Sequence, residues 1–177
     1  MQYVGINMKI LKTGRLTLHQ LKPNDAPFIL DLLNEPAFHK YIGDKGVRER
    51  KGALEYLENG PIASYENYGY GLYLVKELAS HSSIGICGLK KREVLEIPDL
   101  GFAFIKKYWG QGFATEAGQA VLDYAQKELK LFHIAAITHP DNEGSIKVLT
   151  KLGFEFKKIV HLAGFDNPNK LFEIDLN

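Results

Sequence analysis

The amino-acid sequence predicts a single α+β domain, in which a mixed and mostly antiparallel sheet is flanked by helices. Its 177 residues suit one hydrophobic core, because cores typically serve about 100 to 200 residues. The chain is 45% apolar and 24% charged, close to the globular average, which disfavours disordered and fibrous classes. Segments with the periods of strands and of helices follow one another without a repeat or a linker. We therefore expect residues 1–177 to form one domain.

The charge balance and the cysteine content narrow the class further. The 22 basic and 21 acidic residues leave a net charge of +1, too small to attract a nucleic acid through overall charge. A single cysteine cannot form an internal disulfide, and neither a signal peptide nor an apolar run of about 20 residues is visible. We expect a cytoplasmic protein with no nucleic-acid or membrane partner.

The N-terminal third predicts one strand and two helices. Residues 14–21 alternate between apolar and polar side chains, which indicates a half-buried strand. Residues 23–25 supply turn and capping chemistry for a helix over 28–33, which Pro36 is expected to end. A second helix is expected over 47–58.

The middle of the chain changes from helical to strand periodicity. The Asn-Gly-Pro sequence at 59–61 is expected to stop the second helix. Three short segments rich in aromatic or β-branched residues follow, at 69–75, 83–89 and 100–105. Polar or glycine-bearing turns separate them, so we expect consecutive antiparallel strands.

The next three elements alternate between helix and strand. Apolar residues at helical spacing from Ala117 to Leu129 indicate an amphipathic helix of about four turns. Residues 132–138 are apolar on both faces, as in a central strand covered by helices. A short helix over 145–152 follows, with Gly153 as its C-terminal glycine.

The C-terminus predicts a pair of strands. Residues 154–162 and 171–176 have strand character, and the Asp-Asn-Pro-Asn sequence at 166–169 is expected to form the turn between them. The whole order of elements, β-α-α-β-β-β-α-β-α-β-β, describes a mixed sheet with helices on its faces.

The loop over residues 108–115 carries the first chemical signal. Gly110 and Gly112 lie between a predicted strand and a predicted helix, where backbone N–H groups can converge on an anion at the positive helix end. The loop is neither a Walker A motif nor a Rossmann fingerprint, which disfavours nucleoside triphosphates and nicotinamide cofactors. A glycine-rich turn that only starts a helix is the alternative, and the loop alone leaves both open.

Three sets of motifs resemble one family. They are Thr13-Gly14-Arg15-Leu16-Thr17-Leu18 with Asn24-Asp25-Ala26, Ile97–Phe104 with Tyr108–Ala117, and Asn142-Glu143-Gly144-Ser145 with Leu152-Gly153-Phe154. Over nearly its whole length the chain resembles the GNAT superfamily of N-acetyltransferases, and within it the RimJ/RimL-like ribosomal-protein group. The resemblance implies a splay between two central strands of the sheet, one ending at Ile105 and the other at Thr138, with acetyl-CoA bound in the splay.

The resemblance also implies the residues that bind acetyl-CoA. The pantetheine arm would pair with the backbone of one strand, at Phe102, Phe104 and Ile105. The pyrophosphate would bind the loop and the helix start, at Gly110, Gln111, Gly112, Phe113, Ala114 and Thr115. Asn142 would hydrogen-bond the same molecule, although asparagine is also a good helix N-cap, and both roles stay open.

Departures from the family pattern bear on the mechanism. Trp109 stands where many members have Arg or Gln, so its side chain is expected to pack instead of binding phosphate. Leu149 replaces the tyrosine that commonly acts as general acid, and Ile137 replaces a frequent glutamate. By resemblance to the RimL-type motif, Ser145 is the candidate to protonate or hydrogen-bond the departing thiolate, with an ordinary first-turn helix serine as the alternative.

The missing glutamate favours an acceptor amine of low pKa. At pH 7, deprotonating a lysine amine costs about 4.6 kcal/mol, whereas an α-amine costs about 1.1 kcal/mol. Glu96, Asp99 and His139 are candidates to accept the proton directly or through water, and the base stays unassigned.

The function predicted is acetyl-CoA-dependent N-acetyl transfer to a primary amine, through direct transfer in a ternary complex. The acceptor is a protein or peptide N-terminus or a small amine, and a homodimer is allowed. A backbone N–H near Phe104 or Ile105 is expected to stabilise the oxyanion. A CoA-binding module that has lost catalysis and acts through protein contacts is the alternative.

Other reactive residues are assigned ordinary roles. Cys87 lacks a readable histidine partner and is expected to pack within a strand. The six histidines show no ligand spacing, so we expect no metal. Lys90-Lys91-Arg92 and Lys106-Lys107 are expected to be solvated turns, although the second pair could attract the phosphates of CoA.

Overall fold

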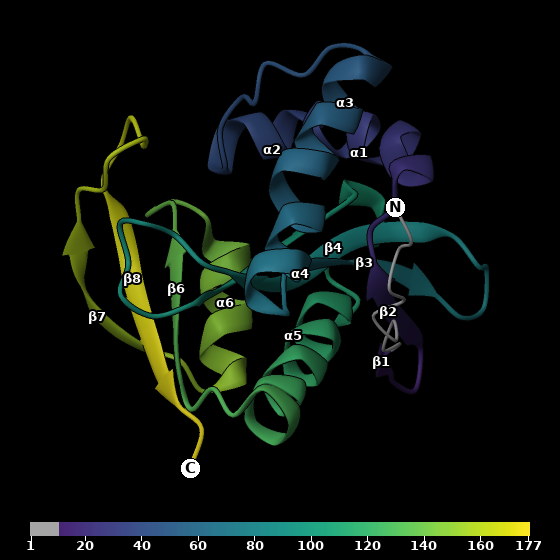
Figure 1. The fold of residues 1–177 in the computed structure, drawn as a ribbon. Helices are drawn as coiled ribbons and strands as arrows, with labels where there is room; N and C mark the ends of the chain where they lie inside the picture. The colour runs from purple at the N-terminus through teal and green to yellow at the C-terminus, as the bar shows by residue number, and fades with distance from the viewer. Residues whose placement is uncertain (1–10) are drawn as a thin grey trace.

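The computed structural model describes residues 11–177, which form one eight-stranded sheet with helices on its two faces (Figure 1). The strand order is β1-β2-β3-β4-β5-β6-β8-β7. The strands are β1 (Leu11–Lys12), β2 (Leu16–Gln20), β3 (Leu72–Glu77), β4 (Ser83–Lys90), β5 (Asp99–Phe104), β6 (His133–Thr138), β7 (Glu155–Val160) and β8 (Asn169–Asp175). All neighbouring pairs are antiparallel except β5 and β6, which confirms the predicted mixed sheet.

Two groups of helices cover the two faces of the sheet, and Figure 1 shows α1–α3 apart from α5 and α6. The helices are α1 (Ala26–Leu33), α2 (Pro36–Tyr41), α3 (Arg50–Leu57), α4 (Ala63–Tyr68), α5 (Phe113–Tyr124) and α6 (Glu143–Leu152). Short 3₁₀ turns are η1 (Pro23–Asp25) and η3 (Lys106–Tyr108), and π turns are η2 (Glu58–Ile62) and η4 (Ala125–Leu129). No helix of residues 11–177 has the length and hydropathy needed to cross a membrane.

Side-chain alternation along β5 gives each face of the sheet its own core. Leu100 and Phe104 point into the core shared with α5 and α6, and Phe102 packs against it. Ala103 packs against the core shared with α1, α2 and α3, where Ile86 of β4 is also buried. A residue of β5 can therefore be assigned to a face by its number alone, even numbers to the α5 face and odd numbers to the α1 face.

The parallel pair β5 and β6 is joined at one register position, Asp99 with Ala135. The Ala135 N–H donates to the Pro98 carbonyl at 2.9 Å, and beyond this point the two strands part. On its other side β5 pairs with β4 at every position from Asp99 to Phe104. The sheet is therefore open between β5 and β6, which confirms the predicted splay between the two central strands.

The expected stop at residues 59–61 is wrong, because the chain stays helical from α3 through η2 into α4. Pro61 is buried inside the π turn, where the wider hydrogen-bond spacing accommodates a residue that has no N–H. The continued helix brings Tyr65 into the core, and its hydroxyl contacts the backbone of both Leu21 and Leu72. Gly69, with a φ of 77°, ends the helix instead.

Two other element boundaries also differ from the predictions. Pro36 does follow the end of α1, but it is also the first residue of α2, a position that proline favours. Asn169 belongs to β8 and pairs with Val160, so the connection between β7 and β8 is wider than the expected turn at 166–169.

Candidate active site

A cavity of about 430 Å³ lies where β5 and β6 separate. Its lining comes from both faces of the sheet, because it includes Phe102 and Phe104 on the α5 side and Asp99, Gly101 and Ala103 on the α1 side. The cavity therefore runs through the sheet and can admit one molecule from each face.

One end of the cavity is the start of α5. Gly110 and Gly112 have φ angles of 72° and 81°, values that glycine adopts without the strain other residues incur. Gly112 occupies the N-cap position, and no side chain of residues 11–177 caps this helix end. The N–H groups of residues 113–115 lie in the first turn, where an α-helix provides no internal acceptors. We call the backbone of Gly110–Thr115 the amide wall.

A side-chain clamp holds the amide wall in place. The Arg15 Nε–H donates to Glu116 Oε2 at 2.7 Å, and Arg15 Nη1 donates to the Gln111 carbonyl at 2.9 Å. The Arg15 guanidinium also lies 4.4 Å from the centre of the Phe113 ring. Burial pulls the Glu116 pKa upward, but hydrogen bonds from Thr13 and Arg15 outweigh it and leave the pKa below its usual value.

Arg15 and Glu116 were assigned no role from the sequence, although both lie in the family motifs. Their contact joins positions 101 residues apart, and no local pattern reports a pairing of that range.

The end of β5 supplies fewer free backbone groups than expected. The Ile105 N–H donates to the Ile84 carbonyl at 3.0 Å, and the Ile105 carbonyl accepts from the Tyr108 N–H at 2.9 Å. Ile105 is also absent from the cavity lining. Its N–H and carbonyl are therefore not available for the roles that were expected of them toward acetyl-CoA and the oxyanion. Because backbone groups alternate sides along a strand, those of Phe102 and the Phe104 N–H face the opening instead.

Trp109 fixes the connection between β5 and α5. Its indole N–H donates to the Phe104 carbonyl at 2.8 Å, while 47% of the residue stays exposed. This hydrogen bond occupies the only donor of the indole, in line with the expected role in packing. It also occupies the Phe104 carbonyl, which leaves the N–H as the free group of that residue. Gln111, like Ile105, does not line the cavity.

The start of α6 brings two predicted residues to the cavity, Asn142 and Ser145. Asn142 Oδ1 accepts the Ser145 N–H at 3.1 Å, so Asn142 is the N-cap of this helix. The cap uses the side-chain oxygen of Asn142 and the backbone N–H of Ser145. The Asn142 amide nitrogen and the Ser145 hydroxyl are not needed for it.

The three candidate bases differ in their placement. Asp99 lines the cavity and is 1% exposed, with Arg92 Nε donating to its Oδ1 at 2.9 Å. Burial raises the pKa of the Asp99 carboxyl against the opposing charge of Arg92. His139 lines the cavity too, but its Nδ1 accepts the Asp141 N–H at 3.1 Å. Glu96 is exposed and outside the lining.

The expectation that Lys90-Lys91-Arg92 is a solvated turn is wrong for two of the three residues. Lys90 and Arg92 line the cavity, together with Lys45, and we call these three side chains with Asp99 the cationic wall. Burial, followed by the charge of Arg92, lowers the pKa of Lys90 to about 8. Only Lys91 behaves as expected, because it is exposed and bonds the carbonyls of the following turn.

The two-residue periodicity of β4 could have predicted that Lys90 faces inward. In β4, Ile86 faces the α1–α3 core, and Gly88 and Lys90 follow at two-residue steps on the same face. A lysine that continues an inward-facing series is not an ordinary turn residue.

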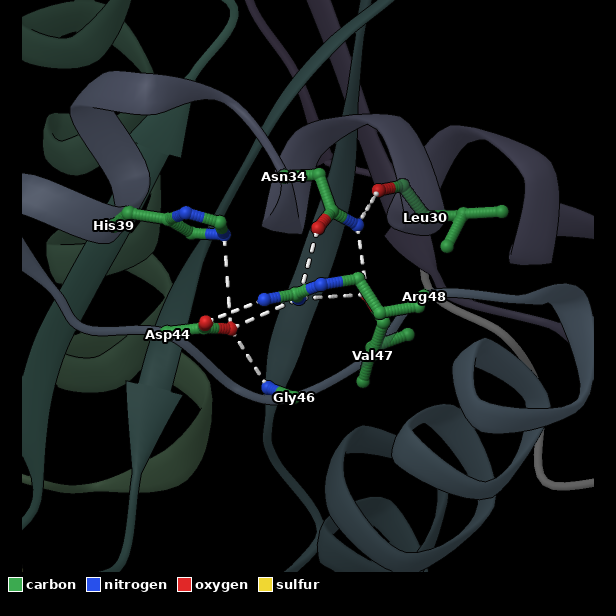
Figure 2. A network of polar contacts seen from close by, with 7 residues as sticks. All are labelled: Leu30, Asn34, His39, Asp44, Gly46, Val47 and Arg48. Carbon is green, nitrogen blue, oxygen red and sulfur yellow. Dashed lines mark hydrogen bonds and ion pairs between the residues drawn. The ribbon is translucent and has the colours of Figure 1, made fainter.

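A polar network holds the segment between α2 and α3 that carries Lys45, as Figure 2 shows. Asp44 accepts hydrogen bonds from both ends of the Arg48 guanidinium, which keep its pKa well below the usual value. Asn34, the C-cap of α1, accepts from Arg48 at 3.0 Å and donates to the Val47 carbonyl at 2.8 Å. The segment around Lys45 is therefore tied to α1.

Cys87 is fully buried in β4, and burial raises its thiol pKa far above the usual value. A thiol that stays protonated is a poor nucleophile, so Cys87 packs within its strand as expected. No group of three or more His, Cys, Asp or Glu side chains that could hold a metal ion occurs within residues 11–177.

Comparison with known proteins links this geometry to acetyl transfer. A family model described as an acetyltransferase (GNAT) domain matches residues 15–155. A Bacillus licheniformis protein named uncharacterized N-acetyltransferase p20 is 30% identical over 150 residues, covering 84% of this chain and 83% of that protein.

Solved structures share the fold. An acetyltransferase from Agrobacterium tumefaciens superposes with a TM-score of 0.80 at 21% identity and covers 98% of each chain. RimL, a ribosomal L7/L12 α-N-protein acetyltransferase solved in complex with coenzyme A, superposes with a TM-score of 0.82 at 14% identity, covering 95% of this chain and 98% of that chain. At these identities the likeness concerns the fold alone.

Proposed function

The chain belongs to the GNAT family of N-acetyltransferases, and from this premise we propose that acetyl-CoA is its donor and a primary amine of low pKa its acceptor. The observation that carries the proposal is the single register position between β5 and β6. It opens the sheet beside the start of α5, so that the edge of β5 and the first turn of this helix line one cavity.

The amide wall fits the pyrophosphate of acetyl-CoA. The first-turn N–H groups of α5 have no side-chain cap from the described residues, and the positive end of the helix dipole favours an anion there. A hydrogen bond from an N–H to a charged oxygen contributes about 1.5 to 3 kcal/mol, so a few suffice to hold a diphosphate. A side chain at Gly112 would crowd this wall, because its Cβ would lie 3.3 Å from Arg15 Nη2.

The open edge of β5 fits the amides of the pantetheine arm. Phe102 turns its N–H and carbonyl toward the opening, where β6 no longer supplies a pairing partner. Exposed strand edges readily pair with an extended amide chain. Asn142 would contribute its amide nitrogen from the opposite side of the opening.

When bound, acetyl-CoA supplies a thioester whose acetyl carbon the acceptor nitrogen attacks. The new C–N bond replaces the C–S bond, the nitrogen loses a proton, and the thiolate gains one. The Phe104 N–H would stabilise the oxyanion, and the Ser145 hydroxyl would protonate the thiolate. Holding the two substrates together can supply about 7 to 11 kcal/mol, so catalysis does not require a strong base.

We infer the class of acceptor amine from the lack of a strong proton acceptor among the candidate bases in the cavity. Ile137 lines the cavity without a proton-accepting group, the Asp99 carboxylate is paired with Arg92, and His139 Nδ1 already accepts a hydrogen bond. An amine that is partly deprotonated in solution is therefore favoured, such as a peptide α-amine or a small amine of similar pKa.

The test is CoA release with acetyl-CoA and a panel of peptides and small amines, with the products identified by mass spectrometry. We expect amine-dependent CoA release and an acetylated nitrogen in at least one product. Tight binding of acetyl-CoA without transfer to any amine would instead indicate a CoA-binding module.

A further inference from the structure

The cavity carries an excess of positive charge that acetyl transfer itself does not explain. Among the described residues, its lining holds five cationic side chains and two carboxylates, Glu35 and Asp99. Two of the cations, Lys147 and Lys151, lie on α6, on the face of the sheet where the amide wall begins. The other three belong to the cationic wall, on the α1 side.

Strand register places the members of the cationic wall beside one another. Lys90 of β4 lies directly opposite Asp99 of β5, and partners in register extend to the same face of a sheet. Arg92 reaches the same carboxylate at 2.9 Å. The Lys90 Cδ would lie 3.6 Å from a Cβ at Gly101, so the lysine stem runs along the cavity side of β5 toward the opening.

The charges of the cationic wall are not balanced within the described part of the chain. The single Asp99 carboxylate is already paired with Arg92, and neither Lys45 nor Lys90 has a described carboxylate within ion-pair distance. The charges of Arg92 and Lys45 both lower the pKa of Lys90, and burial lowers it more. Cations that are partly desolvated and repel one another gain most from an anionic ligand.

The wall is held in position before any ligand arrives. The Asp44 and Arg48 network ties the segment carrying Lys45 to α1 (Figure 2). Phe165, from the connection between β7 and β8, lies with its ring centre 5.5 Å from the Arg92 guanidinium carbon. A preformed cationic site loses little conformational freedom on binding, which favours affinity.

We propose that the cationic wall binds a carboxylate of the acceptor, so that the substrates are primary amines that carry a carboxylate. The wall lies on the α1 side of the sheet, whereas the amide wall and the even-numbered residues of β5 lie on the α5 side, so the two ends of the cavity suit two different anions. The carboxylate can be that of a free amino acid or that of an acidic residue near a peptide N-terminus. The inference rests on the proposed function for the identity of the reaction.

The first experiment does not depend on catalysis. Calorimetry measures the binding of two pairs of product analogues, in which the acetylated nitrogen is an uncharged amide. The first pair is N-acetylglycine and N-acetylglycinamide. The second pair is an N-acetylated, C-terminally amidated peptide that carries either Glu or Gln at the second position. In at least one pair we expect the carboxylate member to bind about tenfold tighter, the size of one charge-assisted hydrogen bond. Equal binding within both pairs overturns the inference, whether or not the enzyme transfers acetyl groups.

The second experiment assigns the effect to the wall. The double variant Lys45→Met, Lys90→Met keeps the aliphatic stems and removes both charges, while Arg92 stays to pair the buried Asp99. We expect it to lose the carboxylate preference in binding and in kcat/KM, with acetyl-CoA affinity within about twofold of wild type. Lys158→Met, on the exposed strand β7, is the matched control and should keep the preference. If the folded double variant keeps the preference for the carboxylate member of each pair, the inference is overturned. If the wild-type protein does not bind acetyl-CoA, this counts against the proposed function alone.

Discussion

The two ends of the cavity, the amide wall and the cationic wall, differ in the chemical groups that line them. The amide wall consists of backbone N–H groups at the start of one helix, and Gly110 and Gly112 keep side chains out of it. The cationic wall consists of side chains from three separate segments: Lys45 follows α2, Lys90 ends β4 with Arg92 two residues beyond it, and Asp99 starts β5.

The difference shows what each end can recognise. A site made of backbone amides needs glycines but no particular side chains. Such a site suits an acetyl donor that a whole family shares. Side-chain cations depend on the identity of each residue, which suits the acceptor, the substrate that differs between relatives. Substitutions at the two walls should therefore separate donor binding from acceptor choice.

The largest effect that we expect concerns which amine is acetylated at the acceptor end. Two versions of one lysine-containing peptide are compared, one with its α-amine blocked and one with its lysine blocked. At pH 7 the α-amine should react faster by about 400-fold, because its deprotonation costs about 3.5 kcal/mol less. The kcat/KM value should rise with pH toward the pKa of the acceptor.

Strong lysine acetylation at pH 6.5, with the α-amine untouched, would contradict this and show that a base is present. Asp99, His139 and Glu96 would then be the first positions to mutate.

At the donor end, Gly112→Val should weaken acetyl-CoA binding by about a hundredfold or more, the loss expected when two charged hydrogen bonds fail to form. The residue has a φ of 81° and lies in the amide wall, so a branched side chain both strains the backbone and obstructs the anion. Calorimetry measures the affinity. Gly69→Val is the control, because its φ of 77° imposes the same strain outside the cavity lining. Full acetyl-CoA affinity in a folded Gly112→Val protein would place the pyrophosphate elsewhere.

Between the two ends, Ser145→Ala should lower kcat by about tenfold to a hundredfold if the hydroxyl protonates the thiolate. The substitution keeps the backbone N–H that Asn142 caps, so helix α6 and the acetyl-CoA affinity should change little. Steady-state kinetics and calorimetry separate the two effects. A variant with full kcat would return Ser145 to the role of an ordinary first-turn residue.

The smallest effect concerns the clamp beneath the amide wall. Glu116 has a folded-state pKa below its unfolded value, so its contribution to stability is present above pH 4.5 and is lost as the pH falls through the folded pKa. Glu116→Gln should lower the free energy of unfolding by about 1 kcal/mol at pH 7, since the pair is partly exposed. The difference from wild type should shrink in chemical denaturation below pH 4.5. A constant difference at all pH values would mean that the charge of Glu116 does not stabilise the clamp.

The sequence predicted the parts of the molecule that depend on local patterns. Alternation located β2, aromatic and β-branched segments between turns located β3, β4 and β5, helical spacing located α5, and two glycines marked the loop that precedes this helix. These succeed because each element is encoded by residues that are near one another in the chain.

The parts that failed depend on contacts between distant segments. Pro61 stays within a helix because Tyr65 must reach the backbone of Leu21 and Leu72, a requirement that the Asn-Gly-Pro sequence does not contain. Lys90 and Arg92 resemble a solvated turn until the sheet places them beside Asp99 and Lys45. The roles of Asn142 and Ser145 toward acetyl-CoA, and the acceptor itself, stay predictions.

The central claim, that acetyl-CoA binds in the opening between β5 and β6 with its pyrophosphate on the amide wall, is tested most directly by backbone amide NMR during a CoA titration. We expect the largest shifts at Gly112, Phe113, Ala114 and Thr115, with further shifts at Phe102 and Phe104 on the open edge of β5. Saturable CoA binding that leaves these amides unshifted, or that moves only residues outside the cavity lining, would contradict the account.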